Sequence, residues 1–348
     1  MNATGRMRRA LAAIVLLLIP LLLWGCAKPV TLYTDMDKYA VRKLIKPFMD
    51  KSGISVYIVG FRGANMLADA IASLKNGEYV KTEQKGLYNY ADVVFSSDIM
   101  MGEALSTRKM LLPFAPDAAA SIPVGAKRDG WWYGVGGHAF VLMWNTDLVC
   151  GEGPQSLLDL ADESLPEGSV ALINPNYMLY YYSGACAKLG ADTVVPFLQR
   201  MLDRSAHWLA TPEETAAKVA GGSAYACLTS LRDALQAKAD GAPVAWAAPD
   251  QEEGQMGAYV LYNTVCLAAV STMPERGRQL ADYLLSPEAE KYAAELGLSN
   301  VTLRDCGAGV PVVRPLETSL EESRKAMQEE LNVILPYFTS ANPKYTGK

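Results

Sequence analysis

Short apolar runs alternate with segments of helical periodicity along the first third of the chain. Residues 30–34, 54–60 and 91–95 are rich in β-branched and aromatic residues and have the length of buried strands. Between them, residues 37–50 and 64–74 place apolar side chains at helical spacing. Strand and helix in alternation predict a parallel sheet with crossover helices.

The same alternation returns in the second half of the chain. It predicts strands at residues 170–173, 207–210, 224–228 and 244–247, and helices from about residue 183 and at 192–203, 213–220 and 231–239. A later helix is expected to open at Pro274 and to end near Ser286. From there the pattern predicts a largely helical chain, with residues 320–335 as the longest piece.

Two longer apolar runs, at residues 139–144 and 259–270, lie between these α/β segments. Three glycines within residues 134–137 precede the first run. One architecture accounts for both runs if the chain crosses twice between two lobes. Ligands of such sheets bind beyond the carboxyl ends of the strands, so we expect the binding site in the cleft between the lobes.

The predicted fold class is therefore α/β, with two lobes and a hinge between them. The first lobe is discontinuous and the second is inserted into it. The expected boundaries are residues 26–135 for the first part of lobe 1, 136–261 for lobe 2, and 262–348 for the return to lobe 1 and the C-terminal helices.

The first 25 residues differ from the rest and are excluded from this fold prediction. They combine three arginines with an apolar run at residues 11–23, which is typical of a secretory signal. The run ends in Leu23-Trp24-Gly25-Cys26, which resembles the lipobox of bacterial lipoproteins. That resemblance implies cleavage before Cys26 and a diacylglycerol on its sulfur, so that the chain is exported and anchored to a membrane. An uncleaved membrane anchor and an ordinary secretory signal are the alternatives, and the shortness of the run disfavours the anchor.

Charge and composition exclude several function classes. The 348-residue chain has a formal net charge of −5, and removal of the three signal-peptide arginines takes it to −8. Nucleic-acid binders instead carry basic patches, so no nucleic-acid partner is expected. No CxxC pair occurs among the six cysteines, so no metal site is predicted, and an odd number beyond Cys26 leaves any disulfide pairing open.

Catalytic motifs are also missing from the sequence. It has two histidines, far apart, and no GxSxG or HExxH motif. We therefore expect no enzyme and no cofactor, with an exported hydrolase as the least favoured class.

Several segments, in order, are similar to type 2 periplasmic binding proteins. They include "VTLYTDMDKYAVRKLIKPFMDKSGISVYIV" at the start, "YADVVFSSD" at the third strand, "GHAFVLMWNTDLV" at the crossing, and later "DYLLSPEAEKYAAELG" and "GVPVVRP". The chain resembles the branch that includes ferric iron, thiamine, phosphonate and polyamine binders. This implies two lobes that close on a small solute and deliver it to an ABC permease with its ATPase.

A lipid anchor suits that role because it raises the effective concentration of the binding protein at its permease. We expect a monomer facing the periplasm or the cell exterior. The alternative within the same fold is a lipoprotein that presents its ligand to a membrane sensor kinase.

Two segments of the first lobe are expected to reach the solute. Arg62 and Gly63 lie between a strand and a helix N-terminus, where free N–H groups and a guanidinium favour an anion. Ser96 and Ser97 follow the third strand and can donate to an oxyanion. The alternatives are an ordinary βα turn at the first segment and a helix cap, with Asp98 as a further candidate, at the second.

The second lobe and the crossing supply the remaining candidates. They are His138 after the glycine cluster, Tyr181, Tyr182 and Ser183 near a helix start, and Ser230 with Arg232 after a strand. In ferric-ion binders the last segment resembles a tyrosine pair, whereas this chain has Ser230 and Leu231. Iron would therefore need the tyrosines at residues 180–182 or would arrive as a chelate. An oxyanion or organic acid would suit the arginines and serines.

Overall fold

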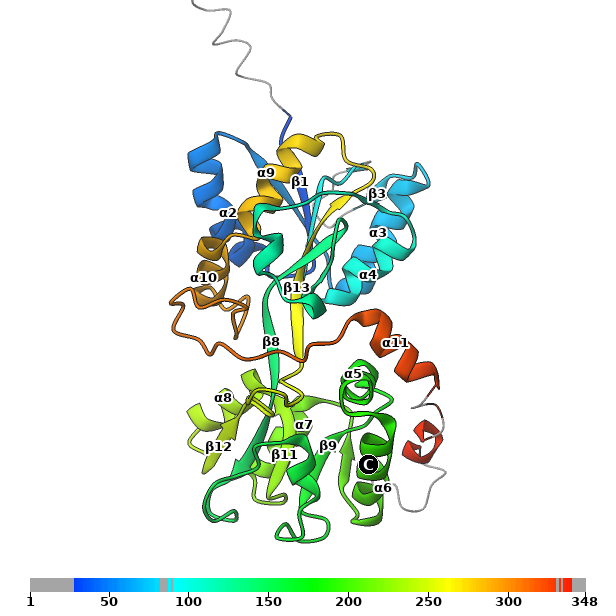
Figure 1. Cartoon of the computed structure of the whole chain (residues 1–348). Helices are drawn as coiled ribbons and strands as arrows, with labels where there is room; N and C mark the ends of the chain where they lie inside the picture. The colour runs from blue at the N-terminus through cyan, green and yellow to red at the C-terminus, as the bar shows by residue number, and fades with distance from the viewer. Residues whose placement is uncertain (1–27, 82–86, 89, 330–331, 333, 340–348) are drawn as a thin grey trace, which may run out of the picture.

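The computed structural model describes residues 28–81, 87–88, 90–329, 332 and 334–339. The predicted signal segment, including Cys26, lies outside the described residues. The described chain forms two α/β lobes joined by a pair of long strands (Figure 1). The predicted α/β two-lobed fold class is thus confirmed.

The first lobe is built as the alternating pattern predicted. Strands β1 (Val30–Thr34), β2 (Val56–Gly60) and β5 (Val93–Ser96) run parallel in the order β5-β1-β2. Helices α2 (Lys38–Ser52), α3 (Ala64–Lys75) and α4 (Ile99–Thr107) connect or follow them. Because the carboxyl ends of parallel strands share one edge, the loops after β1, β2 and β5 all face the second lobe.

The two lobes are joined by antiparallel strands β8 (Trp132–Asn145) and β13 (Val260–Ala268). In the first lobe β13 also pairs with β5, whereas in the second lobe β8 pairs with β11 (Ala226–Ser230) and β12 (Val244–Ala247). One continuous sheet therefore passes through both lobes. The sequence-based boundaries at residues 135 and 261 both fall inside these strands, and the exact domain limits stay a prediction.

The second lobe follows the predicted order of elements. It contains β9 (Val170–Ile173), β10 (His207–Leu209), α6 (Ala191–Asp203), α7 (Pro212–Ala220) and α8 (Leu231–Ala239). Helix α5 (Leu179–Leu189) begins about four residues earlier than predicted. The turn that precedes it is closed by the N–H of Tyr177 on the carbonyl of Asn174, so the helix begins directly after this turn.

Shorter elements complete the described chain. They are strands β3 (Val80–Lys81), β4 (Leu87–Tyr88), β6 (Leu111–Leu112) and β7 (Lys127–Arg128), and the 3-10 helices η1 (Asp117–Ser121), η2 (Val124–Ala126), η3 (Leu157–Ala161) and η5 (Leu335–Phe338). The five cysteines of the described residues form no disulfide with one another.

The C-terminal part differs from the prediction of a largely helical chain. Helices α9 (Pro274–Leu284) and α10 (Pro287–Glu295) form, but residues 297–319 are mostly irregular. Glycines and prolines interrupt this stretch, among them Gly307, Gly309 and Pro315, and both residue types disfavour a helix interior. The final helix α11 (Leu320–Glu329) has 10 residues against 9 in α10, so it is the longer helix of this stretch, as predicted, although it is described only to residue 329.

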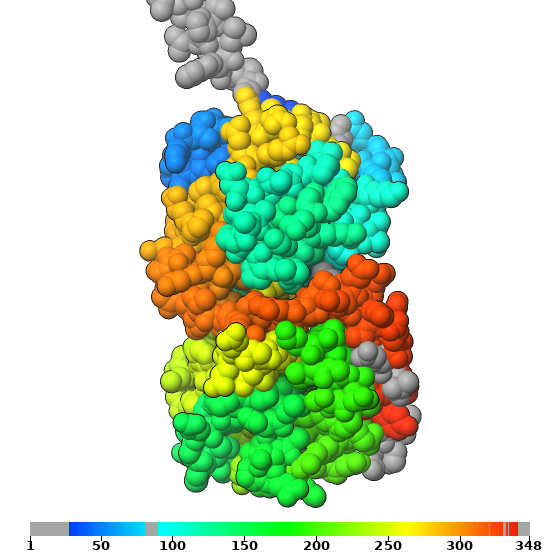
Figure 2. Space-filling view, viewed as in Figure 1, coloured from blue at the N-terminus to red at the C-terminus, as the bar shows by residue number. Residues whose placement is uncertain are grey.

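Residues 300–318, which we call the strap, cross from one lobe to the other beside β8 and β13 (Figures 1 and 2). At its first end, the N–H groups of Asn300 and Val301 donate to the carbonyl of Gly137 on β8, over 2.9 and 3.2 Å. At its second end, the N–H of Leu316 donates to the carbonyl of Ala258 over 2.7 Å. Helix α11 then packs on α5 of the second lobe.

A buried carboxylate stabilises the first lobe away from the hinge. Asp92, fully buried, accepts hydrogen bonds from the N–H of Thr31 and from the hydroxyl of Ser271, over 2.8 and 2.7 Å. The N–H groups of Thr272 and Met273 also donate to it, just before α9 begins. One side chain thus ties β1 to the start of α9, elements separated by more than 230 residues.

We expect Asp92→Ala to lower the free energy of unfolding by on the order of 3 kcal/mol, because several buried donors lose their acceptor at once. Urea denaturation of the purified protein measures this change. Asp69→Ala, on the exposed face of α3, is the matched control and should change stability by less than about 0.5 kcal/mol. Equal stability of the two variants would show that Asp92 does not have this role.

Candidate functional site

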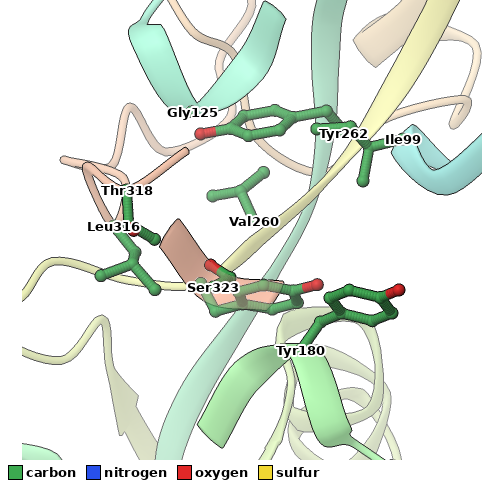
Figure 3. Close-up of a pocket in the computed structure, with 9 residues that line it drawn as sticks. Ile99, Gly125, Tyr180, Val260, Tyr262, Leu316, Thr318 and Ser323 are labelled. Carbon is green, nitrogen blue, oxygen red and sulfur yellow. The ribbon is translucent and has the colours of Figure 1, made fainter. Parts of the chain in front are cut away.

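A pocket opens between the two lobes, on the side where the strap crosses (Figure 3). Its empty volume is about 360 Å³, part of which is open to solvent. Each wall comes from a different part of the chain: Ile99 and Gly125 from the first lobe, Tyr180 from the second, Tyr259, Val260 and Tyr262 at β13, and Leu316, Thr318 and Ser323 from the C-terminal segment. A movement of one lobe relative to the other would therefore change the shape of the pocket.

Three tyrosines supply most of the polar lining. Tyr262 is only 4% exposed, and Tyr180 and Tyr259 are partly buried. None of the three phenol oxygens has a hydrogen-bond partner among the described residues. None of them is among the buried side-chain atoms that lack a partner, so a ligand in the pocket can reach these hydroxyls.

Burial also sets the charge state of these phenols. It raises the pKa of Tyr259 and of Tyr262 far above their usual range, and the nearby carboxylate of Asp98 raises the pKa of Tyr259 further. Burial likewise raises the pKa of Tyr180, with Asp98 and Glu103 acting in the same direction. The phenols are therefore neutral at pH 7, and a ligand that needs phenolates must displace their protons.

The two tyrosines predicted at the cleft, Tyr181 and Tyr182, lie elsewhere. Both are fully buried in the second lobe, where the hydroxyl of Tyr182 donates to the carbonyl of Ile173 over 2.9 Å. The ring of Tyr181 packs edge-on against Tyr259, with centroids 5.7 Å apart. Because neighbours on a helix point about 100° apart, only Tyr180 of the three faces the pocket.

Ser183, also predicted as a ligand residue, is fully buried one turn into α5. Its hydroxyl donates to the carbonyl of Tyr180 over 3.2 Å. The next residue, Gly184, touches the C-terminal segment so closely that an added Cβ would lie 2.7 Å from Cδ2 of Leu316. This part of α5 therefore supports the pocket wall.

The serines after β5 form a small network with an acidic residue. The hydroxyls of Ser96 and Ser97 donate to Asp35 over 3.0 and 3.3 Å, and the N–H of Ser97 donates to the same carboxylate over 2.8 Å. Asp98 caps α4 by accepting from the N–H of Met100 over 2.8 Å. Both predicted serines thus lie at the expected edge of the sheet, with their hydroxyls directed at Asp35.

The other first-lobe candidates lie at the start of α3. Gly63 is the N-cap residue, with a φ of 97° that favours glycine, and no side chain caps this helix. Arg62 beside it is exposed. Both residues lie at the start of a helix, as expected, and their role in binding an anion stays a prediction.

The remaining candidates gather at the start of α8. Ser230 caps this helix by accepting from the N–H of Asp233 over 3.1 Å, and Arg232 forms an ion pair with Asp233 at 3.5 Å. Burial lowers the pKa of His138, and the positive charge of Arg232 lowers it further. The pairing of Phe140 with Ser230 brings β8 beside the start of α8, although none of these candidates lines the described pocket.

Sequence reasoning missed most residues of the pocket. Tyr259 and Tyr262 belong to a run that reads as a plain crossing strand, and Ser323 belongs to a helix with no visible motif. The spacing of Val260 and Tyr262 gave the only available signal, because residues two apart share one face of a strand. Within the described residues, no group of three or more His, Cys, Asp or Glu side chains is placed to hold a metal ion.

Comparison with known proteins identifies the family. The profile of the family described as bacterial extracellular solute-binding protein matches residues 30–299. The chain belongs to this family. The predicted resemblance to solute-binding proteins is thus confirmed, whereas comparison with curated protein sequences gives no significant match.

Solved structures of this solute-binding protein's fold come from several bacteria. The Trichodesmium protein (IdiA, FutA), solved with iron and citrate ligands, has 18% identity and a TM-score of 0.71, with 88% of this chain and 98% of that chain covered. The ferric iron-binding protein A of Mannheimia haemolytica, in an open conformation, has 16% identity and a TM-score of 0.71, with 90% and 100% covered.

A third structure carries a different solute. AfuA of Actinobacillus pleuropneumoniae, solved with fructose-6-phosphate, has 16% identity and a TM-score of 0.58, with 89% of this chain and 97% of that chain covered. At these identities the likeness concerns the fold. Among the helices of the described residues, none has the length and apolar character needed to cross a membrane.

Asp98 makes the stability of this site depend on pH. Burial raises the pKa of its carboxyl, the bond from Met100 lowers it in part, and the charge of Asp35 raises it again. Because the pKa is higher in the folded than in the unfolded state, folding stability falls as pH rises from about 4 through the raised pKa.

We therefore expect Asp98→Asn, which retains a capping oxygen, to be more stable than the wild type at pH 7, with the difference shrinking toward about pH 4. Urea denaturation across this pH range measures it. Asp69→Asn on the exposed face of α3 should show no such trend. A wild type that is the more stable protein at pH 7 would contradict this account.

Proposed function

We propose that this solute-binding protein captures a small solute between its two lobes and delivers it to the permease and ATPase of an ABC transporter. The family match and the pocket, whose walls come from both lobes, support this role. A solute that touches both walls stabilises the closed arrangement over the open one, so capture proceeds by hinge closure without covalent chemistry.

The proposed solute is a ferric complex. The observation that carries this choice is the set of three tyrosines, Tyr180, Tyr259 and Tyr262, that line one pocket between the lobes. Phenolate is an established oxygen ligand of iron in proteins. Two structures of the same fold are described as ferric iron-binding or as containing iron and citrate ligands, which supports this choice.

The alternative solute is a phosphorylated or carboxylated anion. It would use those residues predicted from the sequence that are not fully buried: Arg62, Gly63, Ser97, His138, Ser230 and Arg232. The fructose-6-phosphate structure of the same fold keeps this alternative open. The two candidate solutes predict opposite effects on affinity when the pocket tyrosines or the arginines are substituted.

We expect ferric citrate to give the purified protein a visible phenolate-to-iron absorption band. Tyr259→Phe and Tyr262→Phe should each reduce the band and lower affinity at least about tenfold, because each removes an oxygen ligand. Affinity should rise with pH, since iron must displace protons from phenols whose pKa burial has raised. Absorbance titrations at several pH values measure both effects.

The matched control is Tyr283→Phe. This tyrosine lies on α9, donates to the carbonyl of Leu44 over 2.7 Å and does not line the pocket, so the band should persist. If Arg62→Ala and Arg232→Ala abolish binding of the best solute while the two pocket variants leave it unchanged, the anion is the solute and the ferric proposal fails.

The proposed lipid on Cys26 anchors the protein beside its permease. We expect Cys26→Ser to move the protein from the membrane fraction to the soluble exported fraction, because the sulfur that carries the lipid is gone. Detergent phase partitioning of cell extracts measures the change. Cys150→Ser, at the exposed cysteine, should leave the protein in the membrane fraction. Membrane retention of Cys26→Ser would indicate an uncleaved anchor instead.

A further inference from the structure

The C-terminal segment makes one wall of the pocket, and this wall lies beyond residue 299, where the family match ends. Leu316 and Thr318 belong to the strap, and Ser323 lies one turn into α11. In Figure 3, Ser323 and Tyr262 lie on opposite sides of Val260. A wall from outside the matched residues is a place where this protein can differ in selectivity from others of its fold.

Ser323 has an unusual environment for a serine. It is only 3% exposed, and its backbone N–H donates to the carbonyl of Ser319 over 3.0 Å in the ordinary helical way. Its hydroxyl, however, has no hydrogen-bond partner among the described residues, although it lines the pocket. Its oxygen is not among the buried side-chain atoms that lack a partner, so the hydroxyl is open to a ligand that enters the pocket.

The wall is held in place by contacts with both lobes. Arg314, at the second end of the strap, donates to the carbonyls of Gln251 and Gln255 over 3.3 and 2.8 Å. An added Cβ on Gly125 of the first lobe would lie 2.8 Å from the carbonyl oxygen of Thr318. With Gly184 of α5 equally close to Leu316, this wall has little freedom to move away from a ligand.

The chemistry of the pocket lining narrows the ligand. None of the nine lining side chains carries a formal charge at pH 7: the set combines aliphatic groups with phenol and alcohol hydroxyls. Such a surface binds the carbon atoms of a ligand by van der Waals contact and its oxygen atoms by hydrogen bonding. It suits an organic group with an oxygen acceptor better than a bare ion.

We propose that Ser323 is a specificity-determining residue, which donates its hydroxyl hydrogen to an oxygen of the organic part of the solute, while Leu316 packs against the adjoining carbon. The inference rests on the proposed solute-binding function and adds to it the class of solute: an organic oxygen ligand, alone or as the chelator of iron. The C-terminal segment thereby acts as part of the binding site.

Thiol labelling tests whether a solute reaches this wall. Ser323→Cys is introduced into the protein with Cys26, Cys150 and Cys306 changed to serine, which leaves the three buried cysteines. Methyl methanethiosulfonate is expected to modify the new thiol in the folded protein, as detected by mass spectrometry. Gln328→Cys, on the exposed side of α11, is the matched control and reacts in any case. An unreactive thiol at residue 323 overturns the inference, whatever the solute is.

Binding of ferric citrate to the labelled proteins provides the second measurement. Modification at residue 323 should lower affinity at least about tenfold, and modification at residue 328 should leave it unchanged. Unchanged affinity after modification at residue 323 overturns the inference while the proposed function stands.

If the unmodified protein does not bind ferric citrate, the ferric proposal fails separately from this inference. The labelled proteins are then compared by thermal shift with citrate and with fructose 6-phosphate. A stabilisation that modification at residue 323 removes supports the role of Ser323. If the solutes stabilise both labelled proteins equally, or stabilise neither, the role of Ser323 is overturned.

Discussion

The antiparallel pairing of β8 and β13 is the interaction on which the rest of the structure depends. These strands carry the sheet from one lobe into the other, and each lobe adds its parallel strands to one of them. The pairing needs close backbone contact at the crossing. A Cβ on Gly137 would lie 2.5 Å from the carbonyl oxygen of Leu261, which explains a glycine at this position. The same strands place Tyr262 at the pocket, so the connection between lobes and the polar lining share one element.

Most of the strand and helix order could be predicted from the sequence, because each buried strand is a short apolar run and each helix has one apolar face. For example, Leu44 and Phe48 lie on the buried side of α2, as their spacing indicated, whereas Tyr39 at the start of the helix is 69% exposed. The prediction failed where the local sequence does not determine the path of the chain. The strap has no periodic pattern, and its path is fixed by hydrogen bonds to Gly137 and Ala258, which are distant in the chain.

The candidate site was harder to predict for a related reason. The sequence located the loops at the carboxyl ends of the strands, but it could not give the direction of individual side chains. Tyr180 and Tyr181 differ by one position, yet one lines the pocket and the other is fully buried. Likewise, Ser96 and Ser97 look like free donors in the sequence, and only the fold places Asp35 opposite them.

The strap changes the mechanics of the molecule. With β8 and β13 alone, two adjacent strands would connect the lobes, and a two-stranded ribbon bends and twists readily. The strap adds a third connection, held at Gly137 on one strand and at Ala258 beside the other. Rotation of one lobe about the long axis of the ribbon would have to break one of these attachments. We therefore expect the strap to resist twisting of the lobes more than bending, which would keep the two halves of the pocket in the same registration during closure.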